Sequence, residues 1–185
     1  MRKNFGAKPM IYPMPVLIIG TFDENGVPDA MNAAWGGISE ENEISICISA
    51  DHKTTKNILL NKCFTVSIPD VKNTVAADYV GIASGNDTAD KIEKAGWTYE
   101  KSGIINAPVF NELLFTLECK LTSYDEETCR LVGEILNVSA DESILTDSKV
   151  DLSKFNPITY DPSNHNYVTL GETVGKAFSD GKKLK

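Results

Sequence analysis

The segment 49–58 holds the side chains of this chain that are best placed to do chemistry together. It reads Ser-Ala-Asp-His-Lys-Thr-Thr-Lys-Asn-Ile, so a histidine, two lysines and two threonine hydroxyls stand side by side. An apolar alternating run at 44–48 precedes the segment, and Ile58-Leu59-Leu60, which follows, reads as the buried face of a short helix. Main-chain N–H groups at a helix start, with hydroxyl and ammonium donors beside them, suit a bound phosphate. The segment therefore predicts a phosphate site.

The same residues also have a simpler interpretation. A threonine hydroxyl at a helix start can cap the free N–H groups, and the neighbouring lysines would then be ordinary solvated side chains. On the residues alone, a phosphate site and a plain helix cap both remain open for Thr54 and Thr55.

The composition limits the classes of protein to which this chain can belong. It has 185 residues, a formal net charge of −8 and 42% hydrophobic residues, which fits one domain with a real core. We expect a single domain over 1–185, with a barrel core at about 12–140 and a C-terminal extension at 141–185. The acidic balance argues against a nucleic-acid partner or an anionic membrane. Because no apolar run approaches membrane-spanning length and no signal-peptide pattern opens the chain, we also expect a cytoplasmic location.

The cysteines and histidines give no recognisable metal site. The four cysteines are widely spaced, without a C-x-x-C pair, and only two histidines accompany them. No zinc-type ligand set can be assembled from them, so we predict no metal. Each cysteine lies in an apolar strand-like run, where a reduced, buried thiol is expected. A disulfide between Cys119 and Cys129 across a hairpin stays open, although nothing in the sequence supports it.

Alternating apolar runs separated by turn residues predict a mainly β protein. The predicted strands are 16–22, 28–35, 43–49, 63–68, 113–124, 129–140 and 158–160. Asn25-Gly26 and the polar loop 125–128 predict hairpins, and Gly36-Gly37 is expected to break the chain. A helical pattern over 73–96 is interrupted at Ser84-Gly85. Because strands joined by hairpins dominate and no βαβα alternation is present, a closed or nearly closed antiparallel barrel is favoured.

A set of short motifs in a fixed order resembles a known family. Along the chain they are Pro13-x-Pro15, Gly20-Thr21, Asn25-Gly26, Asn32-Ala33-Ala34-Trp35-Gly36-Gly37, the segment His52 to Ile58, Asp78-Tyr79-x-Gly81-x-Ala83-Ser84-Gly85, Gly133-Glu134-Ile135-Leu136 and Leu170-Gly171-Glu172-x-x-Gly175-Lys176-Ala177-Phe178. Their order and spacing, over nearly the whole chain, resemble the flavin reductase-like proteins with an FMN-binding split barrel. Within that family, the resemblance is closest to the flavoredoxins.

The resemblance implies a fold, a cofactor and partners. The fold would be mainly β, a six-stranded Greek-key FMN-binding split barrel with a few short helices. The protein would be a homodimer with one FMN per subunit near the dimer interface. The flavin would transfer two electrons, supplied by NADH, NADPH or a redox protein partner. No strict catalytic residue is assigned, because the flavin itself carries the chemistry.

The resemblance also places residues around the FMN. The flavin ring would lie beside Asn32, Ala33, Ala34, Trp35, Ser49 and Ala50. The phosphate would lie among His52, Lys53, Thr54, Thr55 and Lys56. A serine-glycine loop near the flavin corresponds to Ser84, Gly85 and Lys91. Without the resemblance, 32–35 would be interpreted as a strand end with a core tryptophan, and Ser84-Gly85 as a break between helices.

Three functions remain open at this point. The first is an oxidoreductase that takes electrons from a nicotinamide nucleotide. The second is a non-catalytic FMN electron carrier, for which docking to a partner matters more than turnover. The third is a flavin-free β-barrel binding module whose threonines only cap a helix. No glycine-rich dinucleotide fingerprint is present, but related reductases do not need one, so its absence discriminates little.

Overall fold

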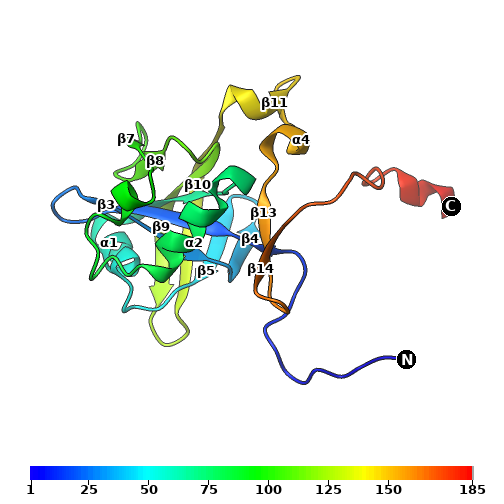
Figure 1. The fold of residues 1–185 in the computed structure, drawn as a ribbon, viewed down its shortest axis with the longest axis horizontal. Helices are drawn as coiled ribbons and strands as arrows, with labels where there is room; N and C mark the ends of the chain where they lie inside the picture. The colour runs from blue at the N-terminus through cyan, green and yellow to red at the C-terminus, as the bar shows by residue number, and fades with distance from the viewer. Residues whose placement is uncertain (185) are drawn as a thin grey trace.

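A computed structural model describes residues 1–184 of the chain (Figure 1). Within these residues, an antiparallel sheet of seven strands curls into a barrel, in the order β3-β2-β6-β9-β10-β5-β4. Its strands are β2 (Leu17–Phe22), β3 (Pro28–Ala33), β4 (Gly36–Glu40), β5 (Glu43–Cys47), β6 (Cys63–Ser67), β9 (Phe115–Asp125) and β10 (Arg130–Ala140). The prediction of a mainly β split barrel is confirmed.

Short pairings and short helices surround this barrel. The flanking strands are β1 (Met14–Pro15), β7 (Tyr99–Lys101), β8 (Pro108–Phe110), β11 (Leu145–Thr146), β12 (Lys149–Val150), β13 (Ile158–Asp161) and β14 (Asn166–Thr169). The helices are α1 (Lys53–Asn61), α2 (Thr74–Ile82), α3 (Lys91–Lys94) and α4 (Leu152–Phe155). They connect barrel strands or lie over one side of the barrel (Figure 1).

The seam of the barrel lies between β3 and β4. These strands occupy opposite edges of the sheet, yet only Ala34 and Trp35 separate them in the sequence. The segment 28–40 is therefore one bent strand that serves both edges, and counted in this way the barrel has the six strands expected. Gly36 and Gly37 begin β4 rather than break the chain. The crossing between the two sheet edges leaves little space at Gly36. A Cβ at Gly36 would come within 3.0 Å of both Leu17 and the Ser45 carbonyl oxygen.

The barrel strands are buried from both sides where the helices cover them. Every residue of β2 is buried, which explains its unbroken apolar run. Ile19 packs inside the barrel with Phe64 and Leu131. Ile18, on the opposite face, packs with Trp97 and other residues under α2 and α3. This second apolar layer holds the helices against the barrel wall.

Helix α1 buries a narrower face than the sequence suggested. Ile58 is fully buried, but Leu60 is 56% exposed, so the prediction that Ile58-Leu59-Leu60 share one buried face is wrong. Consecutive helical residues point in directions about 100° apart, so three of them in a row cannot all face the barrel. The buried face of α1 instead includes Thr54, Thr55 and Asn57.

The predicted hairpins form, and each turn is held by an aspartate. Asp23 accepts hydrogen bonds from the main-chain N–H groups of Asn25 and Val27 at 2.9 Å, and Gly26 takes a φ of +77°. Asp125 accepts from Glu127 at 2.9 Å in the β9–β10 turn. These contacts explain why local turn chemistry was enough to predict both connections.

The cysteines do not follow the expectation that all four are buried. Cys63 and Cys119 are buried, whereas Cys47 is exposed and Cys129 half-buried, and all four, within the described residues, are free thiols. Cys119 pairs with Ile135 within the β9–β10 ladder, and Cys129 lies at the far end of that hairpin. Because the register separates them, Cys119 and Cys129 do not face each other.

The region after residue 140 returns to the barrel instead of trailing from it. β13 pairs with β1 and with β14, so residues 158–169 lie beside the start of the barrel. The N-terminal arm and the last residues extend outward (Figure 1). Within residues 1–184, no helix is both long enough and apolar enough to cross a membrane. The expectation of a single domain, with a barrel core that ends at about residue 140 and a C-terminal extension after it, stays a prediction.

Candidate functional site

A hollow of about 410 Å³ opens at the barrel seam, and six of the residues predicted for a flavin site line it. We call it the seam hollow. It is lined by Met31, Asn32, Ala33, Ala34, Trp35, Cys47, Ile48, Ser49, His52, Cys129 and Tyr160. The two sheet edges meet here, so residues from the end of β3 face residues from the end of β5. Its volume lies in the range usual for small-molecule sites.

One wall of the seam hollow is made of small side chains. Ala33, Ala34 and Ser49 leave the main chain accessible, while the Trp35 side chain stands at the rim and is 57% exposed. Trp35 is therefore not a core residue. Ala50 follows Ser49 and is half-buried, without lining the hollow itself.

Asn32 is fixed in place at the edge of the hollow. Its Nδ2 group donates to the Ala77 carbonyl at 3.0 Å and lies 3.4 Å from the Tyr167 hydroxyl. A Cβ at Gly81 would come within 2.9 Å of the Asn32 Cβ, so helix α2 can approach this closely only with glycine there. The amide oxygen of Asn32 is the group that a ligand would meet as an acceptor.

The start of helix α1 adjoins the seam hollow through His52, its N-cap residue. His52 has extended backbone angles, and its side chain makes no capping hydrogen bond within the described residues. The first turn also contains no acidic residue. The first N–H groups of a helix have no partner inside the helix, and a positive dipole end surrounds them. The helix start thus offers main-chain donors to an anion.

The two threonines of this helix start face inward. Thr54 and Thr55 are fully buried; the Thr54 hydroxyl donates to the Asp29 carboxylate at 2.5 Å, and the Thr55 hydroxyl donates to the Ser49 carbonyl at 2.7 Å. Each hydroxyl has one proton to donate. Both threonines therefore hold the helix start against the barrel, and direct donation from them to a phosphate stays a prediction.

The Ser84–Lys91 loop packs beside the same helix start. The amide of Asn86 donates to the Asp51 carbonyl at 3.2 Å, and a Cβ at Gly85 would collide with the Asp29 carboxylate. Lys91 is fully buried, pairs with Asp29 at 3.0 Å and donates to the Ala83 carbonyl at 3.1 Å. Its ammonium supports the loop from inside and does not line the seam hollow.

The remaining predicted residues, which are two lysines of the phosphate cluster and the serine of the serine-glycine loop, lie at the surface. Lys53 pairs with Asp23 at 3.1 Å, while Lys56 and Ser84 are exposed. For Asp23, burial acts to raise the pKa, but hydrogen bonds from Val27, Lys53 and Asn25 outweigh it and lower the pKa. The structure thus brings the predicted groups to one region. Some of them line the open seam hollow, and others form hydrogen bonds and ion pairs within the protein that hold the helix start and the loop in place.

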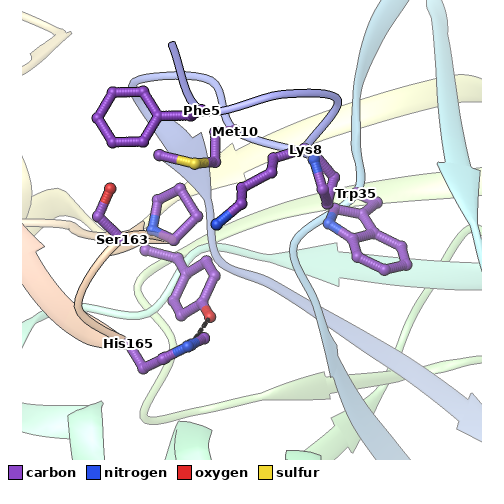
Figure 2. Close-up of a pocket in the computed structure, with 9 residues that line it drawn as sticks. Phe5, Lys8, Met10, Trp35, Ser163 and His165 are labelled. Atoms are coloured by element: carbon purple, nitrogen blue, oxygen red, sulfur yellow. Dashed lines mark hydrogen bonds between the residues drawn. The ribbon is translucent and has the colours of Figure 1, made fainter. Parts of the chain in front are cut away.

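A second hollow, of about 460 Å³, adjoins the seam hollow and was not expected from the sequence. We call it the arm hollow; its lining residues are Phe5, Lys8, Pro9, Met10, Trp35, Tyr160, Pro162, Ser163 and His165. In Figure 2, Lys8 reaches from the N-terminal arm into the space between Trp35 and His165. The Tyr160 hydroxyl and His165 Nδ1 form a hydrogen bond of 2.7 Å.

A smaller hollow of about 210 Å³ lies on the α2 side of Asn32. Here Tyr167 donates to Asp78 at 2.8 Å. Burial, and then the Asp78 carboxylate, raise the pKa of Tyr167 to about 12. Tyr160 lines this hollow, the seam hollow and the arm hollow alike. Sequence reasoning missed Tyr160, because its strand, β13, reaches the site only through pairing with β1.

Among residues 1–184, no group of three or more histidine, cysteine or acidic side chains is arranged to hold a metal ion.

Comparison with known proteins places the chain in a family. Residues 10–171 match the model of the flavin reductase like domain. The chain belongs to this family. It is similar to the flavoredoxin of Desulfovibrio vulgaris (Miyazaki F), with 35% identity over 98% of this chain and 100% of that one and a TM-score of 0.93. The resemblance to flavin reductase-like proteins and flavoredoxins is thereby confirmed.

Two further structures support the fold. A flavoredoxin from Methanosarcina acetivorans is 25% identical, over 100% of this chain and 98% of that chain, with a TM-score of 0.87. An FMN-binding domain of a flavin reductases-like enzyme from Shewanella baltica OS155 is 18% identical, over 88% of both chains, with a TM-score of 0.79. At that identity, the second similarity concerns the fold alone.

Proposed function

We propose that this member of the flavin reductase-like family binds FMN in the seam hollow and works as a flavoprotein oxidoreductase. The observation that carries the proposal is the seam hollow itself. It joins a wall of small residues, which suits a flat ring, to an uncapped helix start, which suits a phosphate. Family membership and the 35% identity with a flavoredoxin support the same conclusion.

The proposed ring end of the site consists of Asn32–Trp35, Ser49 and Ala50. Small side chains at Ala33, Ala34 and Ser49 let a planar ligand approach the main chain. The amide oxygen of Asn32 accepts a hydrogen bond from the ligand, because the Asn32 Nδ2 is committed to Ala77. Trp35 closes the rim between the seam hollow and the arm hollow.

The proposed phosphate end is the start of α1. There the main-chain N–H groups after His52 meet the phosphate, and the exposed His52, Lys56 and Ser84 add donors from outside. Thr54 and Lys91 act behind them, by fixing the helix start and the Ser84–Lys91 loop through Asp29, and Thr55 fixes the helix start through the Ser49 carbonyl. Lys53 contributes positive charge next to its partner Asp23.

When bound, FMN supplies the acceptor and donor of two electrons, and the protein supplies binding, orientation and access. The arm hollow favours a reductase over a carrier, because about 460 Å³ of space beside the proposed ring end can hold a second small molecule. A nicotinamide nucleotide, NADH or NADPH, is the proposed donor. A carrier that exchanges electrons with a protein needs no such space.

We also propose that the protein works as a homodimer. The edge strand β4 is largely exposed, and Ile38 on it is 65% exposed next to the exposed Trp35. Edge strands with exposed apolar side chains are surfaces that proteins usually cover. A second copy covering β4 would also shield the ring end from water.

An absorbance titration tests the proposal. The purified protein is scanned, FMN is added, unbound FMN is removed, and NADH or NADPH is added without oxygen. We expect retained flavin absorbance that bleaches on addition of the nicotinamide nucleotide. Absorbance that persists until dithionite is added would show an electron carrier instead. Failure to retain any flavin would leave a flavin-free binding module and overturn the proposal.

A further inference from the structure

Two cysteine thiols stand on the wall of the seam hollow, and neither has a role in the proposed flavin site. Cys47 ends β5, and Cys129 directly precedes β10. Both line the hollow, and both are accessible to solvent, Cys47 more than Cys129. The other two cysteines, Cys63 and Cys119, lie in the core. The accessible thiols are therefore the two that are neighbours.

The strand register brings Cys47 and Cys129 within disulfide range. Cys47 is paired with Arg130, and the Cys47 N–H donates away from β10, to Trp35 at 2.8 Å. The next pair, Ile48 with Cys129, is joined by a main-chain hydrogen bond of 2.9 Å. From standard antiparallel spacings, the Cα atoms of Cys47 and Cys129 are about 6 Å apart. Disulfides span Cα separations of roughly 4.4–6.8 Å.

The side chains also point toward the same turn. In a regular strand, diagonal neighbours face opposite sides of the sheet. Cys129, however, has a φ of +57°, which takes it out of strand geometry. The Cys47 thiol donates to the Thr128 carbonyl at 3.9 Å, and the Cys129 thiol donates to the Glu126 carbonyl at 3.8 Å. Both sulfur atoms thus lie against the 125–128 turn.

The surroundings distinguish this pair from the core cysteines. Burial raises the pKa of Cys119 to about 12 and raises the pKa of Cys63. The thiolate is the reactive form of cysteine, so these two buried thiols are inert. Tyr124 lies beside the accessible pair: burial, and then the neighbouring Cys129, Glu126 and Cys47, raise its pKa.

We propose that Cys47 and Cys129 are a reversible dithiol–disulfide couple that exchanges with small disulfides of the glutathione class. The more exposed Cys47 thiolate attacks the small disulfide, and a mixed disulfide forms as one thiolate leaves. The Cys129 thiolate then attacks the Cys47 sulfur, and the second small thiolate leaves. Two protein thiols lose their protons and two electrons to form one S–S bond, and the small disulfide is reduced to two thiols.

The bond would change the seam hollow directly. It would tie the end of β5 to the β9–β10 turn, beside Trp35, to which the Cys47 N–H donates. If FMN occupies the hollow, which rests on the proposed function, oxidation of the pair alters access to the ring end. The couple itself depends on this chain's thiols alone, so it can be tested without a flavin.

The test is a thiol titration read by mass. The full chain is equilibrated in glutathione buffers from reducing to oxidising, with and without FMN, then quenched in acid, unfolded, alkylated and mapped by peptide mass spectrometry. We expect two of the four thiols to escape alkylation in oxidising buffer, with the loss of two hydrogens and a peptide linking Cys47 to Cys129. Dithiothreitol should restore all four. Cys63 and Cys119 serve as internal controls that stay alkylatable.

Single substitutions give the decisive comparison. Cys129→Ser should stop at a glutathione adduct on Cys47, whereas Cys47→Ser should leave Cys129 less readily modified than Cys47 is in Cys129→Ser. Full alkylation of all four thiols at every glutathione ratio would overturn the proposal. So would adducts on both cysteines without a bond between them, or a bond between two chains. A linked pair in a protein that retains no FMN even after dithiothreitol has reduced the bond would support the couple and refute the flavin site.

Discussion

The two ends of the proposed flavin site differ in what their side chains contact. At the ring end, Ala33, Ala34 and Ser49 leave the hollow open, and the side chains present there face a ligand. At the helix start, Thr54 and Lys91 are buried and bound to Asp29, so the polar side chains satisfy one another. The ring end therefore recognises a ligand by shape and accessible groups. The helix start recognises it mainly through the main chain, which the buried network holds in position.

The largest effect that we expect is a loss of unfolding free energy when the buried network behind the helix start is broken. Asp29→Asn removes the negative charge from a pair in which both side chains are only 3% exposed. An uncompensated buried lysine typically costs about 3–5 kcal/mol of unfolding free energy. We expect a loss of that size in urea or thermal unfolding, together with weaker FMN binding.

A matched surface pair and a rescue sharpen this prediction. Asp90→Asn breaks the exposed ion pair with Lys94, and we expect a much smaller loss of stability than for Asp29→Asn, because water screens an exposed pair. Combining Asp29→Asn with Lys91→Met removes the buried charge and should recover much of the stability. If Asp29→Asn costs no more than Asp90→Asn, the buried network does not support the helix start as described.

The second effect concerns binding at the ring end. Ala34→Leu adds a branched side chain where Ala34 lines two hollows, in space that is open to a ligand. We expect FMN affinity to fall by about 100-fold, equivalent to about 3 kcal/mol, while unfolding stability changes little. Fluorescence titration with FMN measures the loss. Ala89→Leu, at an exposed loop position, serves as the control with unchanged affinity. Equal affinities for the two variants would remove Ala34 from the site.

The third effect tests whether the Thr54 hydroxyl supports the helix start or contacts the phosphate. Thr54→Val keeps the shape of the side chain but removes the hydrogen bond to the Asp29 carboxylate, which should cost about 1.5–3 kcal/mol of stability. Thr54→Ser keeps the hydroxyl and should retain both stability and FMN affinity. If Thr54→Val loses affinity at full stability, the hydroxyl contacts the phosphate directly, and the supporting role assigned to it here is wrong.

The contrast between the two ends also explains what the sequence could and could not predict. Strand β2 follows from its compact, mostly apolar run, β9 and β10 follow from their long β-type runs, and turn residues such as Asn25-Gly26 mark the connections, because all of these cues lie within a few residues of each other. The residues at the ring end were predicted through the resemblance, and the structure brings Asn32–Trp35 to one hollow. Asp29 was missed because Thr54 and Lys91, its partners, are distant in the sequence.

Other features escaped prediction for a related reason. Strand β4 has the sequence Gly-Gly-Ile-Ser-Glu, which lacks apolar alternation, and its place is set by pairing with β5. Tyr160 reaches the site because β13 pairs with β1 across most of the chain. The adjacency of Cys47 and Cys129 depends on the register between β5 and β10. Each of these is a long-range pairing, and no local pattern specifies it.

The smallest effect concerns what holds Asn32 at the ring end. Burial and Asp78 raise the pKa of Tyr167 to about 12, above the usual value of about 10. In this interval the unfolded chain loses the Tyr167 proton while the folded chain keeps it, so this group's contribution to stability is full below about pH 10 and falls as the pH rises toward 12. Tyr167→Phe should abolish that part of the alkaline loss, and an ultraviolet titration should show one late-titrating tyrosine fewer.

Because the Tyr167 hydroxyl lies 3.4 Å from Asn32 Nδ2, the same variant should weaken FMN binding less than Ala34→Leu does. Loss of a tyrosine that titrates near the usual value, instead of a late-titrating one, would show that burial and the Asp78 carboxylate do not hold this hydroxyl.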